Sequence, residues 1–293
     1  MNGTTPRIAV VVLNFRFPEV TLRCLESLTE GNPADFAIYL VDNSPDDLSE
    51  KILREGLART GREHRYLPSP VNGGFGSGMN LGMCAALSDG FTHVATLNND
   101  TLAEPGFGAR LAEAATLHPD EVLAGLILDT DTRDPSFNIG NLNRWTLEVE
   151  HLLDRKYSGN PDFVSGCFAV FPADVLNTAG LFREDYFLYA EDTELCLRLK
   201  AAGYAIRFCP TVVITHRPGT SADRTGTPKQ YYLVRNHTHL VWTRGRLVQK
   251  IVYTFYMAAV LLNQARHPKV FRSVKTGLLD AWRGRMGQRD TAL

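Results

Sequence analysis

Cysteine is scarce in this 293-residue sequence, and the cysteines that are present are dispersed. They are odd in number and never stand in a CxxC arrangement: Cys24, Cys84, Cys167, Cys196 and Cys209. A disulfide framework needs paired cysteines and a zinc knuckle needs them at short spacing, so the pattern argues against both. Widely separated thiols of this kind are typical of a protein kept in the reducing cytoplasm.

The sequence also has no long apolar run, no low-complexity tract and no repeat of fixed period. Its first six residues lack a basic region and a cleavage site, so we predict no signal peptide. With 44% apolar and 22% charged residues, the composition is that of an ordinary globular protein. At this length, one catalytic domain with an appendage is as plausible as two domains.

The net charge of −1 conceals a marked asymmetry along the chain. Residues 228–293 contain 12 Lys and Arg but only Asp280 and Asp290, which makes this segment +10. The preceding residues contain 19 basic and 30 acidic side chains and are therefore −11. The basic segment should seek anions, and an anionic membrane or a nucleic acid would supply them. No nucleic-acid-binding motif is recognisable in it, so we expect no nucleic-acid partner.

Short apolar runs alternate with helical patterns through the first two thirds of the chain, which predicts an α/β sheet with helices on its faces. The expected strands are residues 7–14, 36–42, 64–67, 92–97, 122–128, 163–171 and 205–209. The expected helices are residues 18–28, 46–57, 78–87, 105–118, 173–178 and 191–202, with Pro18 and Pro105 in first turns.

Two segments depart from this alternation. Residues 129–162 are rich in Asp, Asn, Pro and Gly, which predicts an inserted loop or hairpin region. From residue 228 the pattern is helical, with an apolar stretch at 251–262. Its twelve residues are too few to span a bilayer, which takes about 20. Either this stretch lies on a membrane surface or it packs its apolar face on the catalytic domain.

Polar residues follow the second expected strand, at the edge where open α/β sheets bind ligands. Asp42 could accept hydrogen bonds from a nucleotide base or ribose, although Asp-Asn-Ser-Pro also suits a turn or a helix N-cap. A glycine-rich segment, PVNGGFGSGMNLGM, follows and would let the backbone approach a phosphate or sugar closely. It is not a dinucleotide fingerprint, because Met79 stands where the third glycine of GxGxxG belongs.

A cluster of oxygen donors comes at the end of the strand 92–97, where Asn98, Asn99 and Asp100 occur in sequence. Such donors suit Mg²⁺ or Mn²⁺ bridging a diphosphate. Asp100 is the only carboxylate among them, so further ligands are needed, and His216 is the best candidate. An imidazole ligand would favour Mn²⁺ modestly. The alternative for His216 is a partly buried loop histidine.

Adjacent carboxylates, Glu191 and Asp192, begin the amphipathic helix 191–202. Acidic residues in a first turn gain from the helix dipole, which is the structural interpretation. The functional interpretation is that one of them faces a pocket and removes a proton from an acceptor hydroxyl.

Seven segments occur in the order found in family 2 glycosyltransferases: VVVLNF, LVDNSPDD, NGGFGSGMNLG, LNND, VSGCFAVF, YAEDTELCLRLKAAGY and THRPG. The sequence resembles this family over residues 7–240, and most of all its bacterial rhamnosyltransferase-like branch. The resemblance implies the α/β GT-A fold, a Rossmann-like mixed central sheet flanked by helices, with a helical C-terminal extension. Residues 1–227 would be the catalytic domain and 228–293 a basic helical segment packed on it.

The resemblance also implies residue roles. Asp42 would contact the base or ribose, Asp100 and His216 would hold the metal, and Asp192 would be the base. Asn98 replaces the first carboxylate of the usual DxD motif. The full set of candidate donor-binding residues is Asn14, Asp42, Asn43, Asn72, Gly74, Phe75, Asn80, Asn98, Asn99 and Asp100. The candidate acceptor-binding residues are Gly166, Cys167, Glu191, Tyr231 and Arg235.

Tyr231 and Arg235 share one face of an expected helix at four-residue spacing. Arg235 could bind a donor or acceptor diphosphate, or the helix could be solvated with aromatic packing.

A single base implies inversion at the anomeric carbon. We expect Mn²⁺ or Mg²⁺ as cofactor and a dTDP- or UDP-sugar as donor, with dTDP-rhamnose first. The acceptor would be a glycan, lipid-linked or small-molecule hydroxyl.

The main alternative is a sugar-nucleotide-binding scaffold at the membrane that has lost turnover, although Asp100, Asp192 and His216 argue against it. A Rossmann oxidoreductase is disfavoured by the failed glycine spacing. We expect a cytoplasmic protein, with peripheral attachment to the inner face of the membrane and a homodimer both left open.

Overall fold

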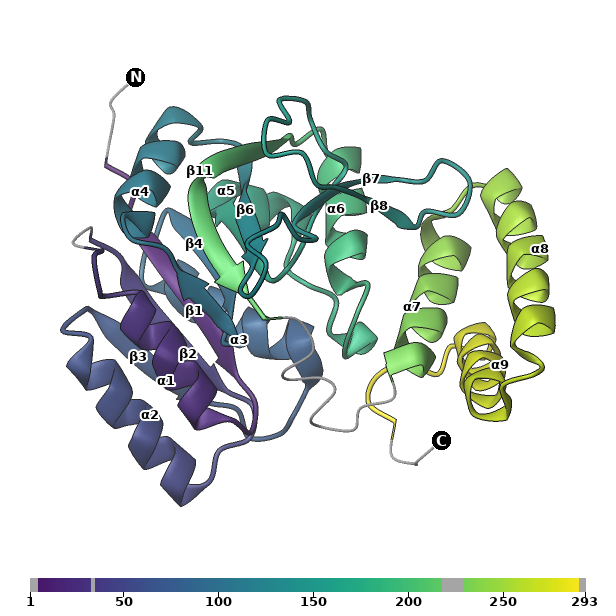
Figure 1. Ribbon diagram of the computed structural model, residues 1–293, viewed down its shortest axis with the longest axis horizontal. Coiled ribbons are helices and arrows are strands. Elements are labelled where there is room, and N and C mark those ends of the chain that lie inside the picture. Colours follow the sequence, from purple (N-terminus) through teal and green to yellow (C-terminus); the bar gives the residue numbers. More distant parts are fainter. Residues whose placement is uncertain (1–4, 33–34, 218–228, 290–293) are drawn as a thin grey trace.

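The computed structural model describes residues 5–32, 35–217 and 229–289 (Figure 1). The expected boundary between residues 227 and 228, together with Pro218 and Gly219 of the THRPG segment, lies outside the described residues. The described part is an α/β domain followed by three helices at one end of the molecule (Figure 1).

The central sheet has eight strands in the order β3-β2-β1-β4-β10-β6-β11-β5. Strands β1, β2, β3 and β4 are parallel, β10 is antiparallel to both of its neighbours, and β5 is antiparallel to β11. The bounds are β1 Ile8–Asn14, β2 Ala37–Asp42, β3 His64–Pro68, β4 His93–Asn98, β5 Thr101–Ala103, β6 Val122–Asp129, β10 Phe168–Pro172 and β11 Ile206–His216.

The inner strands carry apolar side chains on both faces of this sheet. Helices cover both faces because each apolar face must be kept from water. One face packs against α1 Pro18–Ser27, α2 Asp47–Arg59 and α4 Phe107–Leu117. The other packs against α3 Gly74–Ser88, α5 Ala173–Ala179 and α6 Glu191–Ala201. Pro18 is the first residue of α1, where its missing N–H costs nothing, and the Asp46 side chain caps α2.

Three elements differ from the sequence predictions. Helix α3 begins at Gly74 instead of residue 78, and α4 begins at Phe107, so Pro105 precedes that helix. The strand expected to end at residue 209 continues to His216 across a bulge between Cys209 and Val213. Pro210 lies in this bulge and has no N–H to pair, which explains the apparent end of the strand.

The segment 129–162 contains a hairpin, formed by β7 Ile139–Leu142 and β8 Val149–Leu152. Strand β9 Phe163–Val164 joins it to make a small three-stranded sheet. The single strand expected over residues 163–171 is therefore two strands in two sheets, separated by residues 165–167. This interruption matters below, because residues 165–167 reach the cavity.

The three C-terminal helices are α7 Lys229–Arg244, α8 Leu247–Gln264 and α9 Pro268–Trp282. They share a core with the hairpin segment, made of Leu147, Val234, Val241, Tyr253, Met257 and Val274. None of the helices in the described ranges has the length and apolarity to cross a bilayer.

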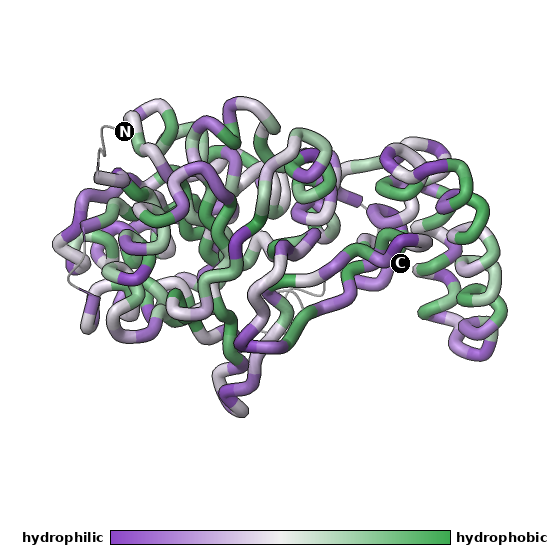
Figure 2. The backbone as a smooth tube through the Cα atoms, turned by 90° about the horizontal axis from the view of Figure 1, so that it is seen from above, coloured by the Kyte–Doolittle hydropathy of each residue, from purple (hydrophilic) through white to green (hydrophobic). Residues whose placement is uncertain are grey.

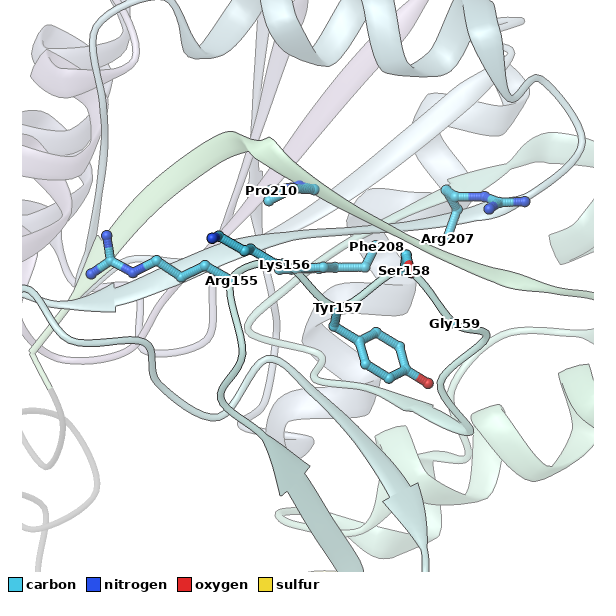
Figure 3. Close-up of a pocket in the computed structure, with 8 residues that line it drawn as sticks. All are labelled: Arg155, Lys156, Tyr157, Ser158, Gly159, Arg207, Phe208 and Pro210. Carbon is cyan, nitrogen blue, oxygen red and sulfur yellow. The ribbon is translucent and has the colours of Figure 1, made fainter.

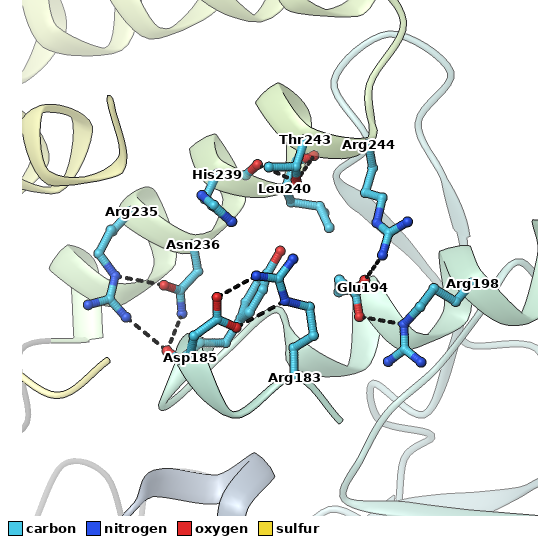
Figure 4. Close-up of polar contacts among 11 residues, drawn as sticks. Arg183, Asp185, Glu194, Arg198, Arg235, Asn236, His239, Leu240, Thr243 and Arg244 are labelled. Carbon is cyan, nitrogen blue, oxygen red and sulfur yellow. Dashed lines mark hydrogen bonds and ion pairs between the residues drawn. The ribbon is translucent and has the colours of Figure 1, made fainter. Parts of the chain in front are cut away.

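A buried carboxylate links α6 to α7. Glu194 is fully buried and pairs with Arg198 Nε at 2.9 Å and with Arg244 Nη2 at 2.5 Å (Figure 4). Arg198 also donates to the backbone carbonyls of Ala179 and Leu181. A buried carboxylate is tolerated when such partners replace water, so both arginines are needed to hold it.

Replacing Glu194 with Gln should lower the free energy of unfolding by about 2 kcal/mol, because two charge-assisted bonds in a buried site are lost. Urea unfolding followed by far-UV circular dichroism would measure this. Glu50→Gln is the matched control, since Glu50 and Arg54 form an exposed pair. The control should lose less than about 0.5 kcal/mol. Equal losses in the two variants would contradict the assigned role.

Candidate active site

A cavity of about 1160 Å³ opens at the carboxyl ends of β1 and β4 and extends to the C-terminal helices. Ligands bind at this edge in open α/β sheets, where strand ends leave a crevice. Twelve of the residues predicted from the sequence line it: Asn43, Asn72, Gly74, Phe75, Asn98, Asn99, Asp100, Gly166, Cys167, Glu191, Asp192 and His216.

The candidate metal ligands meet through strand pairing. Strand β5 follows Asp100 directly and runs antiparallel to the end of β11, with Thr101 opposite His216. This register brings His216 Nε2 to 3.4 Å from Asp100 Oδ1, although 115 positions separate them in the chain. Both side chains are less than 10% exposed. The sequence offered no sign of β5, because its three residues are too few to show a period.

These two side chains fit a divalent cation as part of its ligand set. The Nδ1 atom of His216 is buried and has no hydrogen-bond partner among the described residues, so no internal bond selects which ring nitrogen carries the proton. The edge of the His216 ring packs against Phe137 at 5.2 Å between centroids, which holds the imidazole in place. No group of three metal-ligating side chains occurs in the described ranges, so the other ligands would come from water or substrate oxygens.

The pairing of β4 with β10 places a second loop beside the metal ligands. Leu97 lies opposite Phe168, and Asn98 N–H donates to the Cys167 carbonyl at 3.0 Å. The adjoining Gly166 N–H donates to Asp192 Oδ2 at 3.2 Å. A Cβ at Gly166 would approach Phe75 within 2.9 Å, so only glycine fits between them. A continuous line of contacts therefore joins the metal loop to Asp192.

The two carboxyl groups at the start of α6 have raised pKa values. Burial raises the pKa of Asp192, against the effect of hydrogen bonds from Gly166 and Thr193. Burial and then the neighbouring Asp192 charge raise the pKa of Glu191. Oε2 of Glu191 is buried without a hydrogen-bond partner among the described residues. Such shifts suit a proton acceptor, because a more basic carboxylate takes a proton more readily.

A strained backbone segment precedes α6. Phe187, Tyr189 and Ala190 all have positive φ, at 63°, 71° and 66°, although none is glycine. Leu188 N–H donates to the Tyr186 carbonyl across Phe187, which is a γ-turn of the rare positive-φ form. Each such residue costs about 1–3 kcal/mol, and strain of this kind concentrates at functional sites. Residues 187–193 all line the cavity.

Helix α7 holds this segment in place (Figure 4). The side-chain amide of Asn236 donates to the carbonyls of Tyr186, Leu188 and Tyr189 at 2.7–2.9 Å. Arg235 Nη2 donates to the same Tyr186 carbonyl at 2.9 Å, and its Nε donates to Asn236 Oδ1 at 2.8 Å. Both side chains are fully or almost fully buried. Together they form a clamp that fixes the backbone leading into Asp192.

This geometry differs from the acceptor-binding role predicted for Arg235 and Tyr231. Neither residue lines the cavity, and both are at most 2% exposed. The Arg235 guanidinium packs over Tyr232 at 4.8 Å and donates to the Gly287 carbonyl. The Tyr231 hydroxyl donates to Asp280 at 2.9 Å. A buried guanidinium that already donates to backbone carbonyls is poorly placed to bind a diphosphate. The spacing of residues in the sequence does not show whether a side chain is buried.

Three predicted donor-binding residues lie beneath the cavity without lining it: Asn14, Asp42 and Asn80. Asn14 Nδ2 donates to Asp42 Oδ1 at 2.8 Å, and Tyr66 donates to Asp42 Oδ2 at 3.0 Å. Both Asp42 oxygens are thus bonded within the protein, and the side chain is fully buried. Asn80 joins α3 to the backbone of Phe182. The structure gives all three a supporting position below the lining residues.

The glycine-rich segment serves close packing. Gly74 has φ of +86°, and a Cβ there would lie 2.1 Å from the Phe187 carbonyl oxygen. A Cβ at Gly82 would meet Val11 at 2.3 Å. These glycines therefore let α3 approach the strained segment and the sheet, which is a different reason from the approach to phosphate that the motif suggested.

Several lining residues carried no signal in the sequence. Arg16 lies just beyond β1, and Glu148, Glu150 and His151 come from the hairpin. Helix α8 contributes four more: Tyr253, Tyr256, Met257 and Val260. Arg16 could have been predicted from its position directly after a strand. The hairpin and α8 residues could not, because only tertiary packing places them at the cavity.

A second, smaller hollow of about 330 Å³ lies between residues 155–159 and β11 (Figure 3). It is lined by Arg155, Lys156, Tyr157, Ser158, Gly159, Arg207, Phe208 and Pro210. None of the residues predicted for the site lies there, and Arg207 is already paired with Glu121. The larger cavity is therefore the candidate active site.

Comparison with known proteins agrees with this geometry. The model of a family described as glycosyltransferase-like family 2 matches residues 6–233, which is most of the chain. The chain belongs to this family. No curated protein matches the chain at the level of sequence.

Solved structures show the same fold at low identity. The mannosyltransferase PcManGT from Pyrobaculum calidifontis, in complex with GDP-Man and Mn²⁺, has a TM-score of 0.59 and 15% identity over 99% of this chain and 77% of its own. GalNAc-T7 with UDP, GalNAc and Mn²⁺ has a TM-score of 0.63 and 12% identity over 96% and 57%. S. aureus TarS 1–349 with UDP-GlcNAc has a TM-score of 0.55 and 16% identity over 95% and 92%. The predicted GT-A fold is thus confirmed.

The clamp on the strained segment generates a prediction. Asn236→Ala removes three hydrogen bonds, so residues 186–190 should relax and Asp192 should lose its alignment. We expect kcat for sugar transfer to fall on the order of tenfold or more while the donor KM changes less than about twofold. Asn236→Asp, which keeps the shape but cannot donate, should behave in the same way.

Steady-state kinetics on purified variants would measure this split. Asn263→Ala is the control, because Asn263 is exposed on α8. A kcat unchanged in both Asn236 variants, or a loss confined to thermal stability, would refute a positioning role.

Proposed function

We propose that this protein is a metal-dependent inverting glycosyltransferase that moves a sugar from a nucleotide-sugar to an acceptor hydroxyl. One observation carries the proposal. The Asp100–His216 pair and the partly buried carboxyl group of Asp192 line one cavity and are joined by the contacts of residues 166 and 167. A cation-binding pair and a proton acceptor in one crevice are what displacement of a nucleoside diphosphate requires.

The charge of the cavity supports a role for a cation. Among the described residues its lining includes five carboxyl groups, Asp100, Glu148, Glu150, Glu191 and Asp192, against three long cationic side chains, Arg16, Lys229 and Arg289. The pKa of Glu191 is raised to about 8, so the other four are the carboxylates expected to be charged at neutral pH. A diphosphate would be repelled by this surplus of carboxylates unless a divalent cation accompanied it. Asp100 and His216 would hold the metal, which would neutralise charge on the departing diphosphate. PcManGT and GalNAc-T7 were both solved with Mn²⁺, which is consistent with this assignment.

The proposed reaction is a single displacement. The acceptor hydroxyl gives its proton to Asp192 as its oxygen bonds to the anomeric carbon. The bond between that carbon and the diphosphate oxygen breaks, and its electron pair leaves with the nucleoside diphosphate. Attack from the face opposite the leaving group inverts the configuration. The Gly166 and Thr193 N–H groups fix the Asp192 carboxylate, so that it is oriented before the acceptor arrives.

For the donor, we propose a dTDP- or UDP-sugar, with dTDP-rhamnose first because of the resemblance to the rhamnosyltransferase-like branch. The structural neighbours do not favour rhamnose, since their complexes contain GDP-Man, UDP-GlcNAc or UDP with GalNAc. A panel of these nucleotide-sugars, assayed by release of nucleoside diphosphate, would identify the donor. Release from none of them while nucleotide still binds would favour the scaffold alternative.

Metal removal should abolish nucleoside diphosphate release. We expect EDTA-treated enzyme to be inactive and added Mn²⁺ or Mg²⁺ to restore it. Asp100→Ala should lower kcat/KM by at least about 100-fold, because the cation loses the carboxylate of the proposed pair. Glu150→Gln, in the same cavity, is the control and should keep its metal response. Full activity of the Asp100 variant in EDTA would rule out this metal site.

The raised pKa values predict the pH profile. A general base must be ionised, so burial that raises the pKa of Asp192 moves the acid limb of kcat to higher pH. The Asp192 charge raises the pKa of Glu191, so Glu191 stays protonated while Asp192 ionises, and Glu191→Gln should leave this limb in place. Asp192→Asn should lower kcat by roughly 100-fold or more at every pH.

The measurement is kcat between pH 5 and 9 for these variants and for Glu150→Gln, whose profile should match the wild type. A shift of the acid limb in Glu191→Gln would contradict this order of ionisation. Retention of activity in Asp192→Asn would require a different base.

A further inference from the structure

Helix α8 presents an apolar face to solvent. Lys250 is the only charged residue among its 18 residues, and the helix contains no acidic one. Five of its exposed residues recur every three or four positions, which places them on one face: Leu247, Ile251, Phe255, Ala258 and Leu262. Phe255 is 73% exposed and Leu262 is 79% exposed. Figure 2 shows the hydrophobic colouring of the helices at this end of the molecule. We call these five residues the α8 stripe.

Cationic residues lie at both ends of α8 and on the neighbouring helix α9. Over residues 229–289 the only acidic residue is Asp280, and it is 9% exposed and bonded to Tyr231. Nine of the twelve cationic residues of this segment form no salt bridge with the described residues, and seven of them lie at or after the start of α8: Arg246, Lys250, Arg266, Lys269, Arg272, Lys275 and Arg283. Arg246 and Arg266 flank the two ends of α8, and Lys269, Arg272 and Lys275 are exposed on α9.

The opposite side of α8 belongs to the candidate active site. Tyr253, Met257 and Val260 line the cavity, and they lie on the helix face turned away from the α8 stripe. One helix therefore separates the cavity from an exposed apolar surface. A partner that covers the α8 stripe would lie beside the mouth of the cavity.

We propose that the α8 stripe and its surrounding cations dock on the surface of an anionic phospholipid membrane, and that the acceptor is carried by a lipid in that membrane. The second part rests on the proposed function. A helix with an apolar face and flanking Lys and Arg lies in the interfacial plane, with its apolar side chains among the acyl chains and its cations at the anionic headgroups. α8 would then bring the cavity to the height at which a lipid-linked hydroxyl projects.

Charge distinguishes a membrane from a second copy of the chain. A symmetric dimer through the α8 stripe would bring two strongly basic segments face to face, with no exposed acidic residue in the described part of either to offset them. An anionic bilayer offers both an apolar interior and opposite charge. The single lysine in α8 and the absence of acidic residues there fit the bilayer and oppose the dimer.

Sedimentation of the full chain with vesicles tests the docking. We expect binding to vesicles of phosphatidylcholine with 30% phosphatidylglycerol, and at least about tenfold weaker binding to pure phosphatidylcholine. Phe255→Asp combined with Leu262→Asp should weaken binding to the anionic vesicles by at least about tenfold. Lys269→Glu combined with Arg272→Glu should remove most of the preference for anionic lipid. Leu48→Asp is the matched control, because Leu48 is 68% exposed on α2 at the other end of the molecule.

Two further measurements separate the outcomes. Release of nucleoside diphosphate with a soluble acceptor should be unchanged in Phe255→Asp with Leu262→Asp, whereas transfer to a vesicle-borne acceptor should fall with the binding. Loss of nucleoside diphosphate release in all variants would contradict the proposed function, whereas the result on membrane docking would remain valid. Light scattering reports self-association. The proposal would be overturned if the wild-type protein did not bind anionic vesicles. It would also be overturned if the α8 variants changed only the monomer–dimer equilibrium.

Discussion

The candidate site depends on the hydrogen bonds that the Asn236 side chain donates to the backbone carbonyls of Tyr186, Leu188 and Tyr189. Residues 187, 189 and 190 adopt left-handed backbone conformations that non-glycine residues rarely hold. They lead straight into the helix that begins with Glu191 and Asp192. Without external donors the segment would relax, because its γ-turn and positive φ angles are costly in isolation. The direction of the Asp192 carboxylate is therefore decided by a residue 44 positions later in the chain.

Because of this dependence, the C-terminal helices are part of the candidate site. A basic helical segment after residue 228 can be viewed as an appendage added to a complete catalytic domain. In the structure, α7 clamps the backbone of the catalytic loop, its Arg244 pairs with the buried Glu194 of α6, and α8 supplies a wall of the cavity. The α/β sheet provides the proposed metal ligands, while the C-terminal helices complete the side of the cavity that holds the proposed base.

The other half of the site depends on two antiparallel strands of the central sheet. β10 lies antiparallel inside a mainly parallel sheet, β5 pairs antiparallel at its edge, and each one places a loop next to Asp100. β5 brings His216, and β10 brings Gly166 and Cys167. Parallel strands alone would direct only their own carboxyl ends to the crevice. The mixed sheet lets chain segments from three distant parts of the sequence converge on the proposed cation-binding pair and one carboxylate.

The sequence by itself determined the fold class and the identity of the residues at strand ends. Apolar runs and ordered motifs are local signals, so Asp100, Asp192 and His216 could be identified without coordinates, and each lines the cavity. The tertiary structure decided burial and partnership. It placed Asp42 and Arg235 among internal hydrogen bonds, revealed β5, and brought α8 to the cavity wall. Those outcomes depend on packing between segments far apart in the chain, and no local pattern of residue types contains that information.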